Sequence, residues 1–444
     1  MRKHFFRAAA WLLAVCLFAS PALAFTNYAD APEIAAKGCV VYEKNSGELL
    51  YSKGEDERLY PASTTKIMTA LLLLEYGHLN DVVTASRTAI TSVQPGSSIA
   101  GLKTGEKMKL SDLLICLLVP SGNDAANVIA ETVGGSIEAF VDMMNAKAKA
   151  LGCTGTHFVN AHGYHDDDHY TTASDLLKIT LAAMQYPEFV EICGMAQASV
   201  PETNLCEARY FNSTNFMISN TETSAYLYSY CTGGKTGTTT EAGRCFVGFA
   251  QKGDLYLVSV MLGSTTEYTH SGIRRIMSFL DTEELFDWAF SKFTYRTIIS
   301  TSEPAAEVKV ALSDGKDYVV LKPDHEVRRL LHASVELSRF TISITLAEDV
   351  TAPVDRGDVL GTMTVYFDGS PIDTLRLLAA EDVELSQTLY MLQELQRVLH
   401  EPWVGWVIAA LLLLVAAYII FTIQHNRRMR KKLERRRRHR NIRH

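Results

Sequence analysis

The chain has 444 residues, of which 47% are hydrophobic and only 12 are proline, so it can bury at least one large core and is not a disordered chain. The formal charge of −7 is uneven: the last 20 residues carry +10 and the first 24 carry +3, so the 400 residues between them carry −20. An acidic body of this kind argues against nucleic-acid binding, and we expect no nucleic-acid partner.

The first 24 residues have the pattern of an export signal. Three basic residues precede an apolar run over 8–19, and Ala22-Leu23-Ala24 supplies the small residues of a cleavage site. We therefore predict a signal peptide over 1–24 and a mature chain from Phe25. A lipoprotein pattern ending at Cys16 is weaker, because Val15 is a poor residue before the cysteine and the apolar run continues past it.

A hairpin and a helix are predicted around residue 63. Residues 39–43 and 48–53 flank a turn at 45–47, which indicates two paired strands. The run Ile67–Tyr76 is almost wholly apolar and stops at Gly77, which indicates a buried helix. Ser63 then lies at the helix start, where the Lys66 amine can reach its hydroxyl because residues three apart share a helical face. Taken alone, this pair is better explained as a helix cap and a snorkelling lysine.

The middle of the chain predicts an α/β domain. Ser111-Asp112 is expected to cap an apolar helix ended by Pro120, and a second helix follows from Asp124. Further elements are an amphipathic helix over 137–150, a hairpin of strands 244–250 and 255–262, and a helix over 273–290. Helices between two hairpins predict a domain over 25–298 whose sheet is largely antiparallel.

Short strands dominate the next part of the chain. They are predicted at 308–312, 318–321, 340–346, 360–367 and 372–378. Together they indicate a small all-β domain over 299–380, followed by an amphipathic connecting helix over 381–402.

The C-terminal part has the pattern of a membrane span. Residues 403–423 carry no charge, and 21 residues at 1.5 Å each can cross a hydrocarbon core of about 30 Å. The basic tail over 424–444 marks the cytoplasmic side, so we predict a single-pass protein of the cell membrane with its catalytic domain outside the cytoplasm. Contact with anionic lipid explains the tail better than nucleic-acid binding does.

Three short motifs combine into a candidate site: Ser63-x-x-Lys66, Ser121-Gly122-Asn123 and Lys235-Thr236-Gly237. In this order, and behind an export signal, they are typical of serine acyl-transfer enzymes that include β-lactamases and penicillin-binding proteins.

Each motif residue has a predicted chemical role. Ser63 would attack, with Lys66 as the general base because Lys235 and the helix N-terminus lower the pKa of Lys66. Ser121 would pass the proton to the leaving amine, and Asn123 would hold Lys66 and the substrate amide. The remaining roles fall to the strand: Thr236 and Gly237 would line the substrate, and the N–H groups of Ser63 and Thr238 would form an oxyanion hole.

The chain resembles the low-molecular-mass penicillin-binding proteins of the serine-type D-Ala-D-Ala carboxypeptidase family from about Ala36 to Leu378. The resemblance is carried by the segments 60–69, 120–126, 140–145, 160–163, 169–175 and 235–238. The resemblance implies that a peptidoglycan stem peptide acylates Ser63 and loses its terminal D-Ala. It also implies that β-lactam antibiotics inhibit this reaction and that no metal or other cofactor is needed. This chain differs by its full membrane span. The family's carboxylate-binding arginine could be Arg244, Arg274 or Arg275, and the spacing does not decide.

Four other interpretations account for parts of the sequence. A D,D-endopeptidase shares all three motifs, and a non-enzymatic cell-wall sensor would not need them. A class A β-lactamase lacks the second domain and the span. The ligand types at 162–169 invite a zinc site, although we expect an exposed loop because no helical i, i+4 pair is present. The seven cysteines after Cys16 are expected to be mostly buried single thiols.

Overall fold

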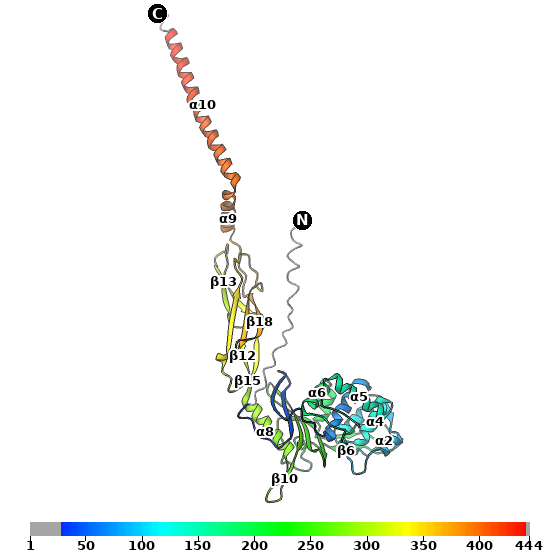
Figure 1. Ribbon diagram of the computed structural model, residues 1–444. Helices are drawn as coiled ribbons and strands as arrows, with labels where there is room; N and C mark the ends of the chain where they lie inside the picture. The colour runs from blue at the N-terminus through cyan, green and yellow to red at the C-terminus, as the bar shows by residue number, and fades with distance from the viewer. Residues whose placement is uncertain (1–27, 441–444) are drawn as a thin grey trace. The chain divides into compact units, whose positions relative to one another are not determined.

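The computed structural model describes residues 28–440, so the predicted signal peptide lies outside the described residues. The described chain divides into two compact units (Figure 1). Unit 1 contains the described residues up to Arg296 together with Arg329–Glu336, and unit 2 contains Thr297–Arg328 and the chain from Leu337. The return of Arg329–Glu336 to unit 1 was not predicted, and it includes part of strand β15 (Val327–His332), which pairs with β12 (Phe293–Ile299).

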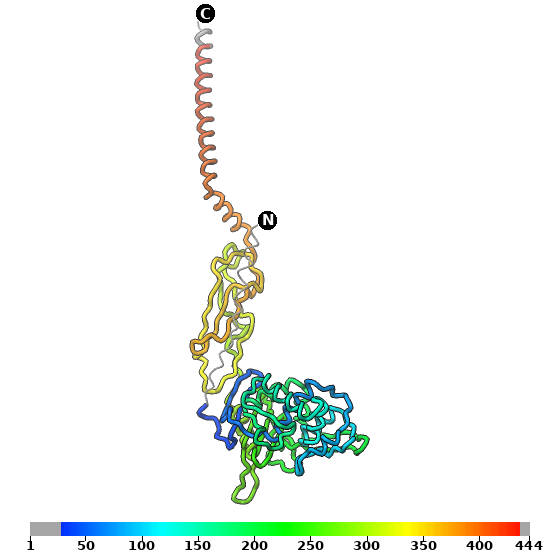
Figure 2. Tube along the Cα trace, turned by 45° about the vertical axis from the view of Figure 1, so that its right-hand side comes forward, coloured from blue at the N-terminus to red at the C-terminus, as the bar shows by residue number. Residues whose placement is uncertain are grey.

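The core of unit 1 is a five-stranded sheet of order β2-β1-β9-β8-β7. Its strands are β1 (Gly38–Glu43), β2 (Glu48–Lys53), β7 (Cys231–Thr239), β8 (Gly243–Lys252) and β9 (Leu255–Ser264). Every neighbouring pair is antiparallel, so segments far apart in the sequence, blue and green in Figure 2, are joined through β1 and β9. The prediction of an antiparallel α/β domain is confirmed.

Alternating side chains of this sheet bury both of its faces. Val40 and Val260 belong to one hydrophobic cluster with most of the helices, whereas Val41 and Met261 belong to another with α8. Figure 1 accordingly shows α8 and the group α4–α6 on opposite sides of the strands. A sheet covered on both faces is a rigid support for residues on its strands.

Eight α-helices are described in unit 1. They are α1 (Lys66–Tyr76), α2 (Arg87–Thr91), α3 (Leu110–Leu118), α4 (Asn123–Gly134), α5 (Ile137–Ala150), α6 (Ala173–Ala183), α7 (Pro187–Cys193) and α8 (Met277–Lys292). Short strands complete the unit: β3 (Val82–Thr84), β4 (Lys107–Lys109), β5 (Gln197–Val200), β6 (Arg209–Asn212), β10 (Thr266–Tyr268) and β11 (Arg274–Ile276).

Two helix starts differ from the prediction. Helix α3 begins at Leu110 with Lys109 at its N-cap and no side-chain cap, so the predicted cap at Ser111-Asp112 is wrong. Helix α8 begins at Met277 instead of Ile273, because Arg274–Ile276 form β11 and pair with β10. The apolar and basic residues before Met277 satisfied the helical pattern, but cross-strand pairing decided their conformation.

Unit 2 is built on a second antiparallel sheet of order β13-β14-β18-β17-β16. Its strands are β13 (Ala306–Lys309), β14 (Tyr318–Pro323), β16 (Phe340–Leu346), β17 (Val359–Phe367) and β18 (Ser370–Ala379). Val319, Val365 and Leu375 are fully buried in its core. The predicted all-β fold of this region is confirmed.

Two helices follow the second sheet in the chain. Helix α9 (Gln387–His400) begins later than predicted, because residues such as Val383 and Leu385 form bridges to Val354 and Ser313. Helix α10 (Pro402–Arg440) is the one helix in the described part of the chain that is long and apolar enough, over 402–435, to cross a membrane.

The cysteines are single thiols throughout the described chain. None of the seven forms a disulfide, and five are buried: Cys39, Cys116, Cys153, Cys193 and Cys245. Burial raises the pKa of both Cys193 and Cys245 to about 12, so neither is a thiolate near neutral pH.

Candidate active site

Ser63 lies in a tight turn between a strained residue and helix α1. The turn is a 3-10 helix over Ala62–Thr65, so Ser63 precedes the α-helix and does not cap it. Ala62 has φ +48, a left-handed conformation that is uncommon for residues other than glycine and is held only by its surroundings. Gly163 supports it from the opposite side: a Cβ on Gly163, which has φ +84, would lie 1.8 Å from the Ala62 carbonyl oxygen.

The Lys66 amine is the centre of the site. It is fully buried, and its Nζ lies 2.9 Å from Ser63 Oγ, 2.7 Å from Asn123 Oδ1 and 2.8 Å from the carbonyl oxygen of His162. Burial, reinforced by the nearby Lys235 ammonium, holds the pKa of Lys66 well below its usual 10.5. Burial is therefore the larger cause of a shift that the sequence assigned to Lys235 and the helix N-terminus.

The three neighbours of Lys66 determine where its lone pair points. Asn123 Oδ1 and the His162 carbonyl oxygen can only accept, so they take both N–H bonds of a neutral amine. The remaining lone pair then faces Ser63 Oγ, whose hydroxyl can donate to it. A neutral Lys66 is thus oriented to take the Ser63 proton.

Ser121 and Lys235 form a second buried pair. Lys235 Nζ donates to Ser121 Oγ at 2.9 Å and to the Thr236 carbonyl oxygen at 2.9 Å. Burial lowers the pKa of Lys235 to about 8. Ser121 itself has φ +64, so both hydroxyl-bearing turns of the site involve left-handed backbone.

Strand β7 places the third motif directly against the Ser63 turn. A Cβ on Gly237 would lie 2.8 Å from the Pro61 carbonyl oxygen and 3.0 Å from the Ser63 nitrogen. Gly237 is therefore required for the close approach of β7 to the turn, a contact that the sequence did not predict. On the same strand, the Thr236 hydroxyl bonds that of Thr214, and the Thr238 side chain is exposed.

Arg244 contacts Thr238, the residue that follows the third motif. Its Nη1 donates to Thr238 Oγ1 at 3.2 Å and its Nε to Thr266 Oγ1 at 3.0 Å. Arg274 is close enough to contribute, after burial, to a lowered pKa of Arg244. Arg275 is the next residue along β11 and points to the other face of that ribbon. Arg244 and Arg274 thus remain as the candidates.

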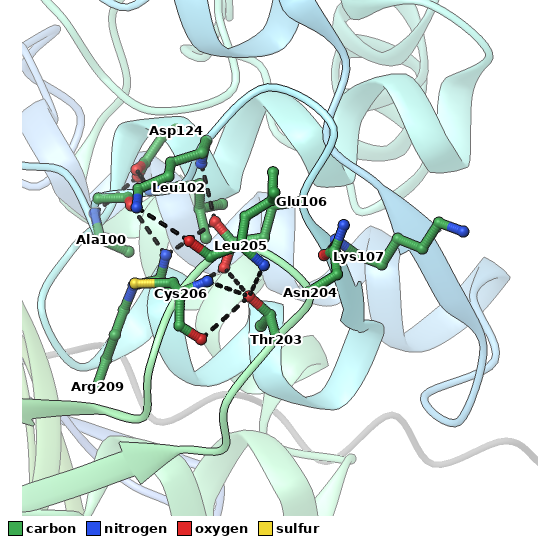
Figure 3. Close-up of polar contacts among 12 residues, drawn as sticks. Ala100, Leu102, Glu106, Lys107, Asp124, Thr203, Asn204, Leu205, Cys206 and Arg209 are labelled. Atoms are coloured by element: carbon green, nitrogen blue, oxygen red, sulfur yellow. Dashed lines mark hydrogen bonds and ion pairs between the residues drawn. The ribbon is translucent and has the colours of Figure 1, made fainter.

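The turn at Ser121-Gly122-Asn123 is held by a loop over residues 98–106, part of which Figure 3 shows beside Asp124. The Asn123 N–H donates to the Ser98 carbonyl, and the buried Asp124 carboxylate accepts from the N–H groups of Ala100 and Leu102 at 2.8 and 2.9 Å.

The far end of this loop is clamped by a buried ion pair. Arg209 Nη1 and Nη2 bond the two oxygens of Glu106 at 2.7 and 2.8 Å, and Nη2 also reaches the Gly101 carbonyl. Glu106 additionally accepts from Thr203. As Figure 3 shows, these contacts link the β5–β6 hairpin to the loop that carries Asp124's partners. The sequence motifs gave no sign of this clamp.

A family model described as D-alanyl-D-alanine carboxypeptidase matches residues 25–266, more than half of the chain. The chain belongs to the D-alanyl-D-alanine carboxypeptidase family. A second model, for the C-terminal domain of penicillin-binding protein 5, matches residues 293–385. The predicted family and the predicted class of serine hydrolase are confirmed.

Relatives of known name agree with this family. The D-alanyl-D-alanine carboxypeptidase DacC of Escherichia coli is 32% identical over 83% of this chain and 89% of its own length. DacF of Bacillus subtilis is 29% identical over 83% of this chain and 91% of its own length. The crystal structure of penicillin-binding protein 5 from Haemophilus influenzae covers 80% of this chain and 98% of its own chain, with 27% identity and a TM-score of 0.56.

The loop over 162–169 differs from its prediction as an exposed loop. Its acidic residues are exposed, but His162 and His169 are buried, and His169 Nε2 bonds Thr65 Oγ1 at 2.8 Å. Burial lowers the pKa of each of the two histidines to about 3. No group of three or more potential ligands arranged for a metal occurs in residues 28–440. The loop therefore packs against the Ser63 turn, through His169 beside Thr65 and Gly163 beside Ala62.

Proposed function

We propose that this protein removes the terminal D-Ala from peptidoglycan stem pentapeptides through an acyl-enzyme on Ser63. The observation that carries the proposal is the buried Lys66 amine, 2.9 Å from Ser63 Oγ, with two fixed acceptors that direct its lone pair at that oxygen. A neutral, oriented amine beside a hydroxyl is what an activated serine nucleophile requires.

The reaction has two halves. Ser63 Oγ bonds to the carbonyl carbon of the penultimate D-Ala while its proton passes to Lys66. The C–N bond then breaks as the nitrogen of the terminal D-Ala takes a proton through Ser121, which is held by Lys235. Water hydrolyses the resulting ester and restores Ser63.

The third motif binds and polarises the substrate. The N–H groups of Ser63 and Thr238 stabilise the oxyanion, a contribution of roughly 3 kcal/mol for each donor. Asn123 holds the substrate amide, and Thr236 and Gly237 line the strand along which the peptide lies. The substrate carboxylate is bound by Arg244, aided by Arg274, because Arg244 contacts Thr238 and both cations lie together.

β-Lactam antibiotics acylate the same serine, and no cofactor takes part. We further propose a single-pass membrane protein with its catalytic domain outside the cytoplasm and its basic tail inside. The apolar helix over 402–435 and the basic residues that follow support this topology.

The test uses the full chain in detergent. We expect fluorescent penicillin to label the protein, D-Ala to be released from a stem-pentapeptide mimic, and Ser63→Ala to lose both properties while keeping its melting temperature. Labelling that survives Ser63→Ala would overturn the assignment. Labelling without D-Ala release, but with cleavage of a cross-linked peptide dimer, would favour the endopeptidase instead.

A further inference from the structure

The Thr214 hydroxyl lies against the third motif without belonging to it. Its Oγ1 is 2.5 Å from Thr236 Oγ1, and the two residues are 22 positions apart in the chain. Neither hydroxyl has another hydrogen-bond partner among the described residues. Both side chains are only partly buried, so the pair borders solvent. The mechanism proposed above uses Thr236 and gives Thr214 no role.

The backbone around Thr214 is fixed before any substrate arrives. Its two neighbours in the chain, Ser213 and Asn215, are both buried. The Asn215 side-chain amide donates to Cys231 Sγ at 3.9 Å, and Cys231 is the first residue of β7, the strand that carries Thr236. The Thr214 hydroxyl is therefore held beside that strand, as a group that orients a binding residue must be.

Thr236 lies on the face of β7 that carries the proposed carboxylate site. Successive side chains of a strand point to opposite faces, so Thr236 and Thr238 share one face and are about 7 Å apart along the strand. Arg244 donates to Thr238 Oγ1 on that face. A substrate carboxylate bound by Arg244 can therefore also contact the Thr236 hydroxyl.

The chemistry of a carboxylate decides which hydroxyl of the pair is the donor. A hydroxyl has one proton to donate and lone pairs with which to accept, whereas an ionised carboxylate can only accept. Thr236 must then give its single proton to the carboxylate, which leaves it an acceptor toward Thr214. A hydroxyl that accepts a hydrogen bond is also a stronger donor to its next partner.

We propose that Thr214 is a positioning residue for the substrate: its hydroxyl donates to Thr236 Oγ1 and turns the Thr236 proton toward the substrate carboxylate. Thr214 itself touches no reacting atom. In the free protein either hydroxyl can be the donor, and the bound carboxylate selects the arrangement in which Thr214 donates. This inference rests on the proposed function, because it needs a substrate with a terminal carboxylate.

The experiment measures steady-state release of D-Ala from a stem-pentapeptide mimic by the full chain in detergent. Thr214→Val removes the hydroxyl but keeps the shape of the side chain, so KM should rise about fivefold while kcat changes little. Thr214→Ala, which removes the hydroxyl with a smaller side chain, should have the same effect. Thr214→Ser keeps the hydroxyl and should stay within about twofold of the wild-type KM.

A control and a double-mutant cycle separate positioning from a structural role. Thr364→Val is the matched control, because Thr364 forms a hydroxyl pair with Thr374 in unit 2, and its KM should equal that of the wild type. Thr236→Val removes the donor to the carboxylate, so adding Thr214→Val to it should raise KM no further. Melting temperatures verify that each variant is folded.

Independent effects of the two substitutions, which multiply in KM, would overturn the inference. An equal loss in Thr214→Val and Thr214→Ser, or a fall in kcat at unchanged KM, would overturn it as well. If the wild type releases no D-Ala, the proposed function fails, and acylation by benzylpenicillin, which also carries a carboxylate, decides the inference separately. A second-order acylation rate about fivefold lower in Thr214→Val would then support the positioning role, and an unchanged rate would refute it.

Discussion

Lys66 Nζ lies 2.8 Å from the carbonyl oxygen of His162, a residue 96 positions further along the chain. A backbone atom of a distant loop therefore helps to fix the direction of the proposed general base. The loop that supplies this atom is itself held by Gly163 against Ala62, the residue before the nucleophile. Base and nucleophile are thus positioned by the same short segment.

The first prediction concerns the acidic side of the pH profile. Lys66 must be neutral to accept a proton, so the acylation rate should fall as the pH drops through its lowered pKa. Removal of the neighbouring positive charge in Lys235→Met should raise the pKa of Lys66 and move this limb to higher pH. The rate of labelling by fluorescent penicillin, measured at about ten pH values from about pH 5 to about pH 10, gives the acidic limb of the wild type and its shift in the variant. A limb that moves to lower pH in the variant would contradict the electrostatic explanation.

The second prediction concerns the alkaline side. The pKa of Lys235 is about 8, and below that pH its ammonium adds to the positive charge of Arg244 and Arg274 that attracts the substrate carboxylate. We expect KM for the peptide to rise above this pH while kcat changes little. Lys235→Arg, whose guanidinium stays charged, should lose this alkaline limb. An unchanged limb in Lys235→Arg would assign it to another group.

The third prediction tests the clamp behind Asn123. Arg209→Met leaves the Glu106 carboxylate buried without its partner, which should destabilise the fold by about 3–5 kcal/mol. Acylation should also slow, because loop 98–106 holds Asn123 and Asp124. Denaturant unfolding and penicillin labelling measure the two effects. The double variant Arg209→Met with Glu106→Met should recover stability, and a double variant no better than the single one would argue against the buried charge as the cause.

The fourth prediction compares two glycines with similar backbone. Gly163→Ala should lower the melting temperature and slow acylation, since its Cβ would overlap the Ala62 carbonyl oxygen. Gly152 also has positive φ, +73, but no atom lies within 4 Å of its Cβ position. Gly152→Ala should therefore lose only about 1 kcal/mol and keep its acylation rate. Equal effects at the two sites would show that backbone strain alone, and not the contact with the Ser63 turn, matters.

The fifth prediction separates the arginines. Arg244→Ala should raise KM for the peptide about tenfold or more, because a hydrogen-bonded charge pair with the substrate carboxylate is lost. Arg275→Ala serves as the control, because Arg275 lies on the face of β11 opposite to Arg274, and this variant should leave KM unchanged. Steady-state kinetics with the pentapeptide mimic provide the measurement. A larger effect at Arg275 would refute the proposed carboxylate site.

Much of the fold was accessible from the sequence where the signal is local. The helix over 137–150 and the strand over 340–346 have the predicted bounds, because hydrophobic period and flanking turn residues define them. Strands β12 and β15 and the short β11 were missed, since their conformation depends on partners distant in the sequence.

In the candidate site, too, the residues with a local sequence signal were predicted and those that depend on distant partners were not. Ser63, Lys66, Ser121, Asn123 and Lys235 were predicted from motifs, and the structure brings them within hydrogen-bond distance in two connected groups. The carbonyl of His162 could not be predicted, because every residue has a carbonyl and residue type carries no signal for it. The Arg209–Glu106 clamp was equally invisible, since two common charged residues 103 positions apart form no pattern.

The left-handed backbone at Ala62 and Ser121 bears on any attempt to make this protein more heat-stable. Each such residue lowers folding stability by on the order of 1–3 kcal/mol. Glycine at position 62 would relieve the strain, yet it would free the chain just before the nucleophile. A variant library selected for melting temperature alone would therefore drift toward inactive sequences at these two positions, and thermostabilising design should begin elsewhere.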